Sequence, residues 1–160
     1  MSAHDFSFTT GTGQLLHLAD FKGRPVLVVN TASECGYTPQ YAGLQQLWQR
    51  YRGRGLVVVG IPSNDFGNQE PGSEKTIKEF CTTRYGVDFP MTAKQTVSGA
   101  NAHPFYRWIV EQTGDAGAPR WNFHKYLIGP DGELVDMWPS RIEPMAPDII
   151  NAIEKLLATA

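Results

Sequence analysis

The sequence predicts an α/β fold in which helices cover both faces of a mixed central β-sheet, and a β-hairpin precedes that sheet. Two continuous apolar runs rich in valine, Pro25–Asn30 and Leu56–Ile61, are too short for helices and suit strands buried on both faces. A segment with helical periodicity lies between them, which is the order of a parallel strand–helix–strand unit. Near the end of the chain, Lys125–Ile128 and Glu133–Trp138 flank the turn sequence Gly-Pro-Asp-Gly and predict an antiparallel pair.

The elements of the first half follow from apolar runs and the glycines between them. Phe6–Thr9 and Gln14–Leu18 surround Gly11-Thr12-Gly13, and this arrangement predicts the N-terminal hairpin. The helix between the two valine-rich strands is expected over Tyr41–Tyr51, where apolar residues recur at helical spacing before two glycines.

The second half alternates helices with short extended runs. A helix is expected from the N-cap Ser73 to Tyr85, where a glycine closes it, and Phe89–Met91 predicts a short strand. The segment His103–Gln112 predicts a helix with a proline in its first turn. A final helix is expected over Ala146–Ala158, with its isoleucines and leucines on one face.

Length and composition limit the possible classes of protein. A chain of 160 residues fits one domain, residues 1–160. Its 14 Lys and Arg residues are scattered, and the net charge of −2 gives no reason to expect a nucleic-acid partner. The N-terminus lacks the pattern of a signal peptide, and no apolar run approaches the roughly 20 residues that cross a bilayer. We therefore expect a cytoplasmic protein without stable membrane insertion.

Cys35 lies between the end of a predicted central strand and the next helix, in the stretch VVNTASECGYTP. Reactive groups collect at this end of the strands in open α/β sheets, and a helix N-terminus favours the thiolate form of a nearby cysteine. Gly36 leaves space for a second molecule beside the sulfur, whereas the neighbouring Glu34 carboxylate opposes the thiolate unless it points away. The alternative is a small buried residue, which free cysteine often is. The position alone leaves both interpretations open.

Several motifs resolve this choice, because in their order along the chain they resemble the glutathione peroxidase family. They are ASECGYTPQY around Cys35, NQEPGS around Gln69, GVDFP, HPFYRWI, and WNFHKYL from Trp121. The resemblance runs nearly end to end and implies a thioredoxin-like fold. It is closest to the selenium-independent members that carry cysteine and use thioredoxin.

The resemblance implies that Cys35 is the peroxidatic residue, with Gln69, Trp121 and Asn122 as its polar partners. These residue types suit the chemistry, because neutral amide and indole N–H groups can donate hydrogen bonds to a thiolate or to peroxide oxygens. Without the resemblance, Gln69 reads as a solvated loop residue, Trp121 as a core residue and Asn122 as a turn residue.

Cys81 supports two interpretations. It lies in the predicted second helix at a spacing that places it on the core face, which indicates an inert buried thiol. The resemblance instead implies that EFCTTRYGVDFP carries the resolving cysteine. A Cys35–Cys81 disulfide would then require this helix to unwind partly, because bridged Cα atoms lie within about 7 Å of each other.

The implied activity is reduction of hydrogen peroxide and organic or lipid hydroperoxides through a Cys35 sulfenic acid, with thioredoxin reducing the Cys35–Cys81 disulfide. We expect no bound cofactor and no metal, since the reductant is a co-substrate and the two cysteines match no zinc pattern. The short stretch between Trp108 and Trp121 lacks the insertion of tetrameric relatives and favours a monomer. The alternatives are a glutathione-dependent peroxidase, a peroxide sensor that passes a disulfide to a partner protein, and a thioredoxin-fold binding module without activity.

Overall fold

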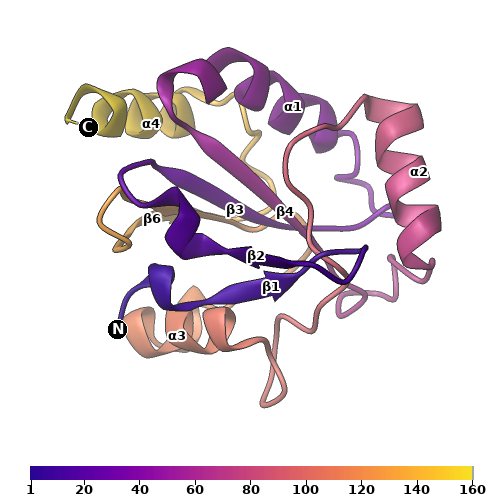
Figure 1. Ribbon diagram of the computed structural model, residues 1–160. Coiled ribbons are helices and arrows are strands. Elements are labelled where there is room, and N and C mark those ends of the chain that lie inside the picture. Colours follow the sequence, from indigo (N-terminus) through magenta and orange to yellow (C-terminus); the bar gives the residue numbers. More distant parts are fainter. Residues whose placement is uncertain (160) are drawn as a thin grey trace.

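The helices and strands of the computed structural model, which describes residues 1–159, follow the predicted α/β order (Figure 1). The strands are β1 (Ser7–Thr9), β2 (Leu15–His17), β3 (Val26–Thr31), β4 (Val57–Pro62), β5 (Lys125–Ile128) and β6 (Leu134–Trp138). The α-helices are α1 (Gln40–Tyr51), α2 (Glu74–Tyr85), α3 (Pro104–Thr113) and α4 (Pro147–Thr159).

The central sheet is mixed and has the strand order β4-β3-β5-β6, while β1 and β2 form the separate N-terminal hairpin. Strand β3 pairs in parallel with β4, starting at Val26 opposite Val57. It pairs with β5 in the antiparallel sense, with Val29 opposite Lys125, and β5 pairs antiparallel with β6. Both halves of the predicted topology are therefore confirmed.

Alternating side chains of β3 enter two different hydrophobic cores. Leu27 and Val29 belong to the core that α1, α2 and α4 cover, whereas Val26 and Val28 belong to the core beneath α3 and the N-terminal hairpin. Figure 1 shows these helices on opposite sides of the sheet. A strand buried on both faces has no polar side to alternate, which explains the continuous apolar run in the sequence.

The boundaries differ from the prediction in a few places. The short strand expected over Phe89–Met91 is wrong in extent, since the structure has a single parallel bridge between Gly60 and Met91. Pro90 accepts a hydrogen bond from the Gly60 N–H at 3.0 Å but has no N–H of its own to extend a ladder. The helix predicted from His103 begins at Pro104, because the His103 ring caps it and accepts a hydrogen bond from the Phe105 N–H at 3.0 Å.

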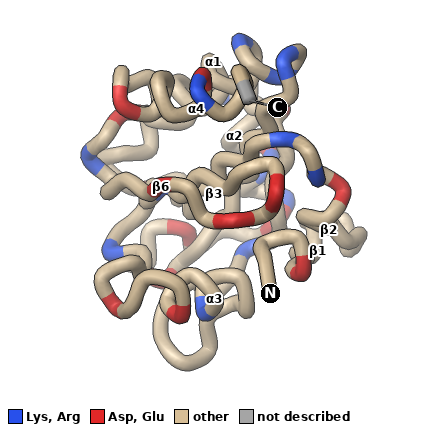
Figure 2. Tube along the Cα trace, turned by 90° about the vertical axis from the view of Figure 1, so that its left-hand side faces the viewer, with Lys and Arg blue, Asp and Glu red and all other residues tan. Residues whose placement is uncertain are grey.

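Charged residues are spread along the chain, as the sequence indicated. Figure 2 shows Lys and Arg interspersed with Asp and Glu on the side of the molecule that it presents. Within residues 1–159, no helix is both long and apolar enough to cross a membrane.

Candidate active site

Three loops meet at one edge of the central sheet because of the strand directions. The loops that follow the parallel strands β3 and β4 leave the sheet at the same edge, and β5 begins there because it runs antiparallel to β3. These loops carry Cys35, Gln69, and the pair Trp121 and Asn122, respectively. The topology thus gathers four residues that the sequence singled out.

Cys35 lies in a tight turn between β3 and α1, where its side chain is 8% exposed. The Thr38 hydroxyl organises this turn, because it accepts a hydrogen bond from the Cys35 N–H at 2.9 Å and donates one to the Ala32 carbonyl at 2.8 Å. The Tyr37 N–H donates a hydrogen bond to Cys35 Sγ at 3.3 Å. The sulfur therefore has a backbone hydrogen-bond donor within the turn itself.

The donor to the sulfur differs from the expected one. Helix α1 begins only at Gln40, so the N–H group that reaches Sγ belongs to the preceding turn and not to the helix N-terminus. The Glu34 side chain, which the sequence placed beside the thiol, is solvent-exposed. A Cβ atom added at Gly36 would meet no atom within 4 Å, so the space expected beside the sulfur is present.

Gln69 and Asn122 form a hydrogen-bonded pair that connects two of the loops. Asn122 is fully buried, and its Nδ2 donates to Gln69 Oε1 at 2.9 Å. The Gln69 carbonyl accepts a hydrogen bond from the Glu34 N–H at 3.0 Å, which joins the pair to the Cys35 turn. Because Asn122 occupies the Gln69 oxygen, the Gln69 NH₂ group remains a donor for the site.

Trp121 lies beside the loop that follows β4. Its ring contacts the Phe66 ring at a centroid distance of 5.9 Å and is 36% exposed. A Cβ atom at Gly67 would lie 3.0 Å from this ring, which is too close for most side chains. Gly67 also has a φ of +67°, a left-handed conformation that favours glycine. The indole is therefore a half-exposed group at the rim of the site and not the core residue of the alternative interpretation.

Asn30 positions the Trp121–His124 segment, and sequence analysis did not identify it. Its Nδ2 donates to the Trp121 carbonyl at 3.0 Å, and its Oδ1 accepts from the His124 N–H at 3.1 Å. Its own carbonyl accepts from the Phe123 N–H at 2.6 Å. A fully buried amide at the end of an apolar strand was the available signal, because a buried polar group needs partners.

Lys125 also holds the Trp121–His124 segment, through the Phe123 carbonyl. Sequence analysis did not identify this residue either. This fully buried side chain donates from Nζ to Gln40 Oε1 and the Phe123 carbonyl, both at 2.7 Å, and to the Ser140 carbonyl at 3.2 Å. Burial lowers the pKa of the Lys125 ammonium to about 7. A lysine at the start of a buried strand was the signal that its three protons needed acceptors.

Cys81 lies apart from the Cys35 turn, on the face of α2 that enters the core. It is 3% exposed, and within residues 1–159 both cysteine thiols are free. Burial raises the pKa of the Cys81 thiol, the Tyr41 hydroxyl opposes that rise, and the nearby Glu70 carboxylate adds to it. In the folded helix Cys81 is therefore a protonated thiol, buried on the core face as the periodicity predicted.

Glu70, which directly follows Gln69, is a further buried group close enough to Cys81 to affect its thiol. It is 1% exposed, and its Oε2 has no hydrogen-bond partner in the described part of the chain. Burial raises the pKa of its carboxyl, and contacts with Ser33 oppose that rise. The charge of this side chain thus contributes to keeping Cys81 protonated.

Comparison with known proteins identifies the chain. The family described as glutathione peroxidase matches residues 3–110. The glutathione peroxidase-like peroxiredoxin of Schizosaccharomyces pombe is 44% identical over 147 residues, which cover 91% of this chain and 92% of that protein. The chain belongs to the glutathione peroxidase family. The predicted family, and with it the enzyme class of a peroxidase, is confirmed.

Two further relatives extend this similarity. The hydroperoxy fatty acid reductase of Synechocystis is 43% identical, with 96% of this chain and 95% of that protein covered. The crystal structure of a glutathione peroxidase from Trypanosoma cruzi superposes with a TM-score of 0.80 at 29% identity, over 99% of this chain and 97% of the other. The thioredoxin-like glutathione peroxidase fold is therefore confirmed.

The remaining ligand-type side chains do not gather into a metal site. Among residues 1–159, no group of three or more His, Cys, Asp and Glu side chains is placed to hold a metal ion. His103 has a structural role, since its Nε2 donates to the Ser7 carbonyl at 2.8 Å and its ring stacks on Phe8.

Proposed function

We propose that this glutathione peroxidase family member reduces hydroperoxides at Cys35. The thiolate attacks one oxygen of the peroxide, so that an S–O bond forms and the O–O bond breaks. The second oxygen takes up a proton and leaves as water from hydrogen peroxide, or as an alcohol from an organic hydroperoxide. Cys35 is oxidised by two electrons to sulfenic acid, and the peroxide is reduced by the same two electrons.

The observation that carries this proposal is the bonded arrangement around Cys35. The Tyr37 N–H already points at the sulfur, and the Asn122–Gln69 hydrogen bond leaves the Gln69 NH₂ group available as a donor at the same edge of the sheet. The Trp121 indole at the rim supplies a further N–H. We assign these donors to the developing negative charge on the leaving oxygen, since preorganised donors of this kind usually make the largest contribution to catalysis.

We further propose that Cys81 resolves the sulfenic acid. Its thiolate attacks Cys35 Sγ, an S–S bond forms, and the S–O bond breaks. The hydroxide leaves as water with the proton that the Cys81 thiol has lost. A thioredoxin dithiol then supplies two electrons, which restore both thiols and leave thioredoxin oxidised.

The names of two relatives and the free thiols support the finer parts of the proposal. The Synechocystis relative, named a hydroperoxy fatty acid reductase, supports lipid hydroperoxides as substrates. The name of the Schizosaccharomyces relative as a peroxiredoxin supports a thioredoxin-type reductant. Two free thiols suit the reducing cytoplasm, and we propose a monomer without bound cofactor or metal.

The test is peroxide consumption with either thioredoxin and its reductase or glutathione and its reductase. The wild type should turn over with thioredoxin, Cys35→Ser should be inactive, and Cys81→Ser should complete one oxidation and then stop cycling. Efficient turnover with glutathione alone would support the glutathione-dependent alternative and leave Cys81 a core residue. Absence of turnover with both reductants would favour a peroxide sensor, which a trapped mixed disulfide with another protein would identify.

A further inference from the structure

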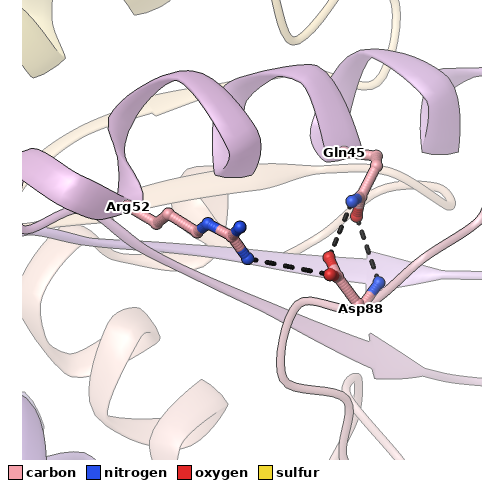
Figure 3. Close-up of polar contacts among 3 residues, drawn as sticks. All are labelled: Gln45, Arg52 and Asp88. Atoms are coloured by element: carbon pink, nitrogen blue, oxygen red, sulfur yellow. Dashed lines mark hydrogen bonds and ion pairs between the residues drawn. The ribbon is translucent and has the colours of Figure 1, made fainter.

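The C-terminal end of α2 is held to α1 by a reciprocal pair of hydrogen bonds between Gln45 and Asp88. Gln45 Nε2 donates to Asp88 Oδ1 at 2.7 Å, and the Asp88 N–H donates to Gln45 Oε1 at 3.1 Å (Figure 3). Gln45 is 6% exposed, so both bonds are made by a buried side chain of α1. The ion pair of Arg52 with Asp88 is longer, at 3.7 Å, and more than half exposed on both sides.

The Gln45–Asp88 pair is connected directly to the backbone of Cys81. The Cys81 carbonyl accepts hydrogen bonds from the N–H groups of Gly86 and Val87, the two residues that precede Asp88. Gly86 has a φ of +61° and ends the helix in the left-handed conformation. Any movement that frees Cys81 must therefore break this cap, and Asp88 fixes the cap to α1.

The core-facing side of α2 borders a cavity as well as the core. This cavity has a volume of about 700 Å³ and is lined by Ile77, Cys81 and Val87 among others. At the other end of the helix, Glu74 Oε1 accepts a hydrogen bond from the Lys94 N–H at 2.9 Å. The helix is thus held by hydrogen bonds at its two ends, and the cavity beside Cys81 leaves room for that residue to move when the C-terminal end opens locally.

We infer that Gln45 and Asp88 are positioning residues that hold Cys81 in the reduced helix and set the rate at which it is freed to meet Cys35. The inference rests on the resolving role proposed for Cys81. Removing the pair destabilises the closed helix and leaves the open state unchanged, since neither bond exists there. The fraction of molecules with Cys81 released then rises, and the Cys35–Cys81 disulfide forms faster.

The experiment uses Gln45→Leu, which keeps a side chain of similar size in the buried position and removes both bonds. The control is Gln46→Leu, the same substitution at the exposed neighbouring position of α1. Hydrogen exchange of the reduced proteins measures opening at the amides of residues 81–85. Quenched thiol alkylation after one equivalent of hydrogen peroxide measures the rate of disulfide formation.

We expect both rates to rise about tenfold in Gln45→Leu, which corresponds to about 1.4 kcal/mol, and less than twofold in Gln46→Leu. Asp88→Ala, at the exposed partner, removes only the bond to the Asp88 carboxylate and keeps the bond from the Asp88 N–H, so both rates should rise by a smaller factor of about three. It serves as the second variant should Gln45→Leu fold poorly. Arg52→Ala should change little, because exposed ion pairs contribute little.

Two results would overturn the inference, and they differ in what else they refute. Unchanged exchange and disulfide rates in Gln45→Leu and Asp88→Ala would refute the positioning role and leave the peroxidase cycle intact. A wild-type protein that consumes peroxide without forming the Cys35–Cys81 disulfide would refute the resolving role of Cys81, and this inference with it.

Discussion

Replacing Asn30 with leucine tests whether a single buried amide holds the Trp121–His124 segment in place. The substitution keeps the approximate volume of the side chain but removes the partners of two backbone groups, the Trp121 carbonyl and the His124 N–H. The buried His124 N–H left without a partner costs about 1–3 kcal/mol and the lost bond to the part-buried Trp121 carbonyl about 1 kcal/mol, so the free energy of unfolding should fall by about 2–4 kcal/mol. The lost hydrogen bonds hold the segment that carries Trp121 and Asn122 in position. Since these side chains are proposed partners of Cys35, its oxidation should slow as well.

Urea unfolding at neutral pH measures the first effect, and stopped-flow oxidation of Cys35 by hydrogen peroxide measures the second. The matched control is Asn151→Leu, which makes the same substitution at an exposed position of α4 and should change stability by less than about 0.5 kcal/mol. If Asn30→Leu were as stable as this control and oxidised at the wild-type rate, the segment would be held by other contacts and the reasoning would be wrong.

Three further predictions concern the same edge of the sheet. Gln69→Leu removes the acceptor of the buried Asn122 Nδ2 and the amide donor that we propose for the reaction, so oxidation of Cys35 should slow at least about tenfold in stopped-flow measurements; an unchanged rate would exclude Gln69 from the reaction. Burial, assisted by Lys125 and Arg120, lowers the pKa of His124 to about 4, so the unfolded chain binds an extra proton between pH 6.5 and 4. Stability should therefore fall by up to about 3 kcal/mol as the pH drops through this window, and His124→Phe should flatten that slope in urea titrations. Burial also lowers the pKa of Lys125 to about 7, so the native protein should gain stability relative to the unfolded chain as pH rises from 7 towards 10; a Lys125→Met variant that kept this gain would contradict the assignment.

The fold could be predicted largely because its signals are local in the sequence. A continuous apolar run such as Leu56–Ile61 and a glycine-closed periodic segment each specify one element without reference to the rest of the chain. The error at Phe89–Met91 arose because strand length depends on a partner, and Pro90 cannot donate to one.

The residues that position the site were harder to predict, because their partners are distant in the sequence. Asn30 bonds to Trp121 across 91 residues, and its position at the end of an apolar run does not reveal that partner. Phe123 adopts a φ of +66°, which its residue type does not suggest. The motifs identified Gln69 and Asn122, but the hydrogen bond between them depends on how two loops pack.

The burial of Cys81 in a capped helix has a consequence for the damage that peroxide could cause. A protonated, enclosed thiol is a poor target for oxidants, so the proposed resolving residue is protected from direct oxidation as long as α2 remains folded. The same enclosure lengthens the life of the Cys35 sulfenic acid, which a second peroxide can convert irreversibly to sulfinic acid. The stability of α2 would therefore set the peroxide concentration at which inactivation overtakes recycling, and variants with a looser helix should survive higher doses.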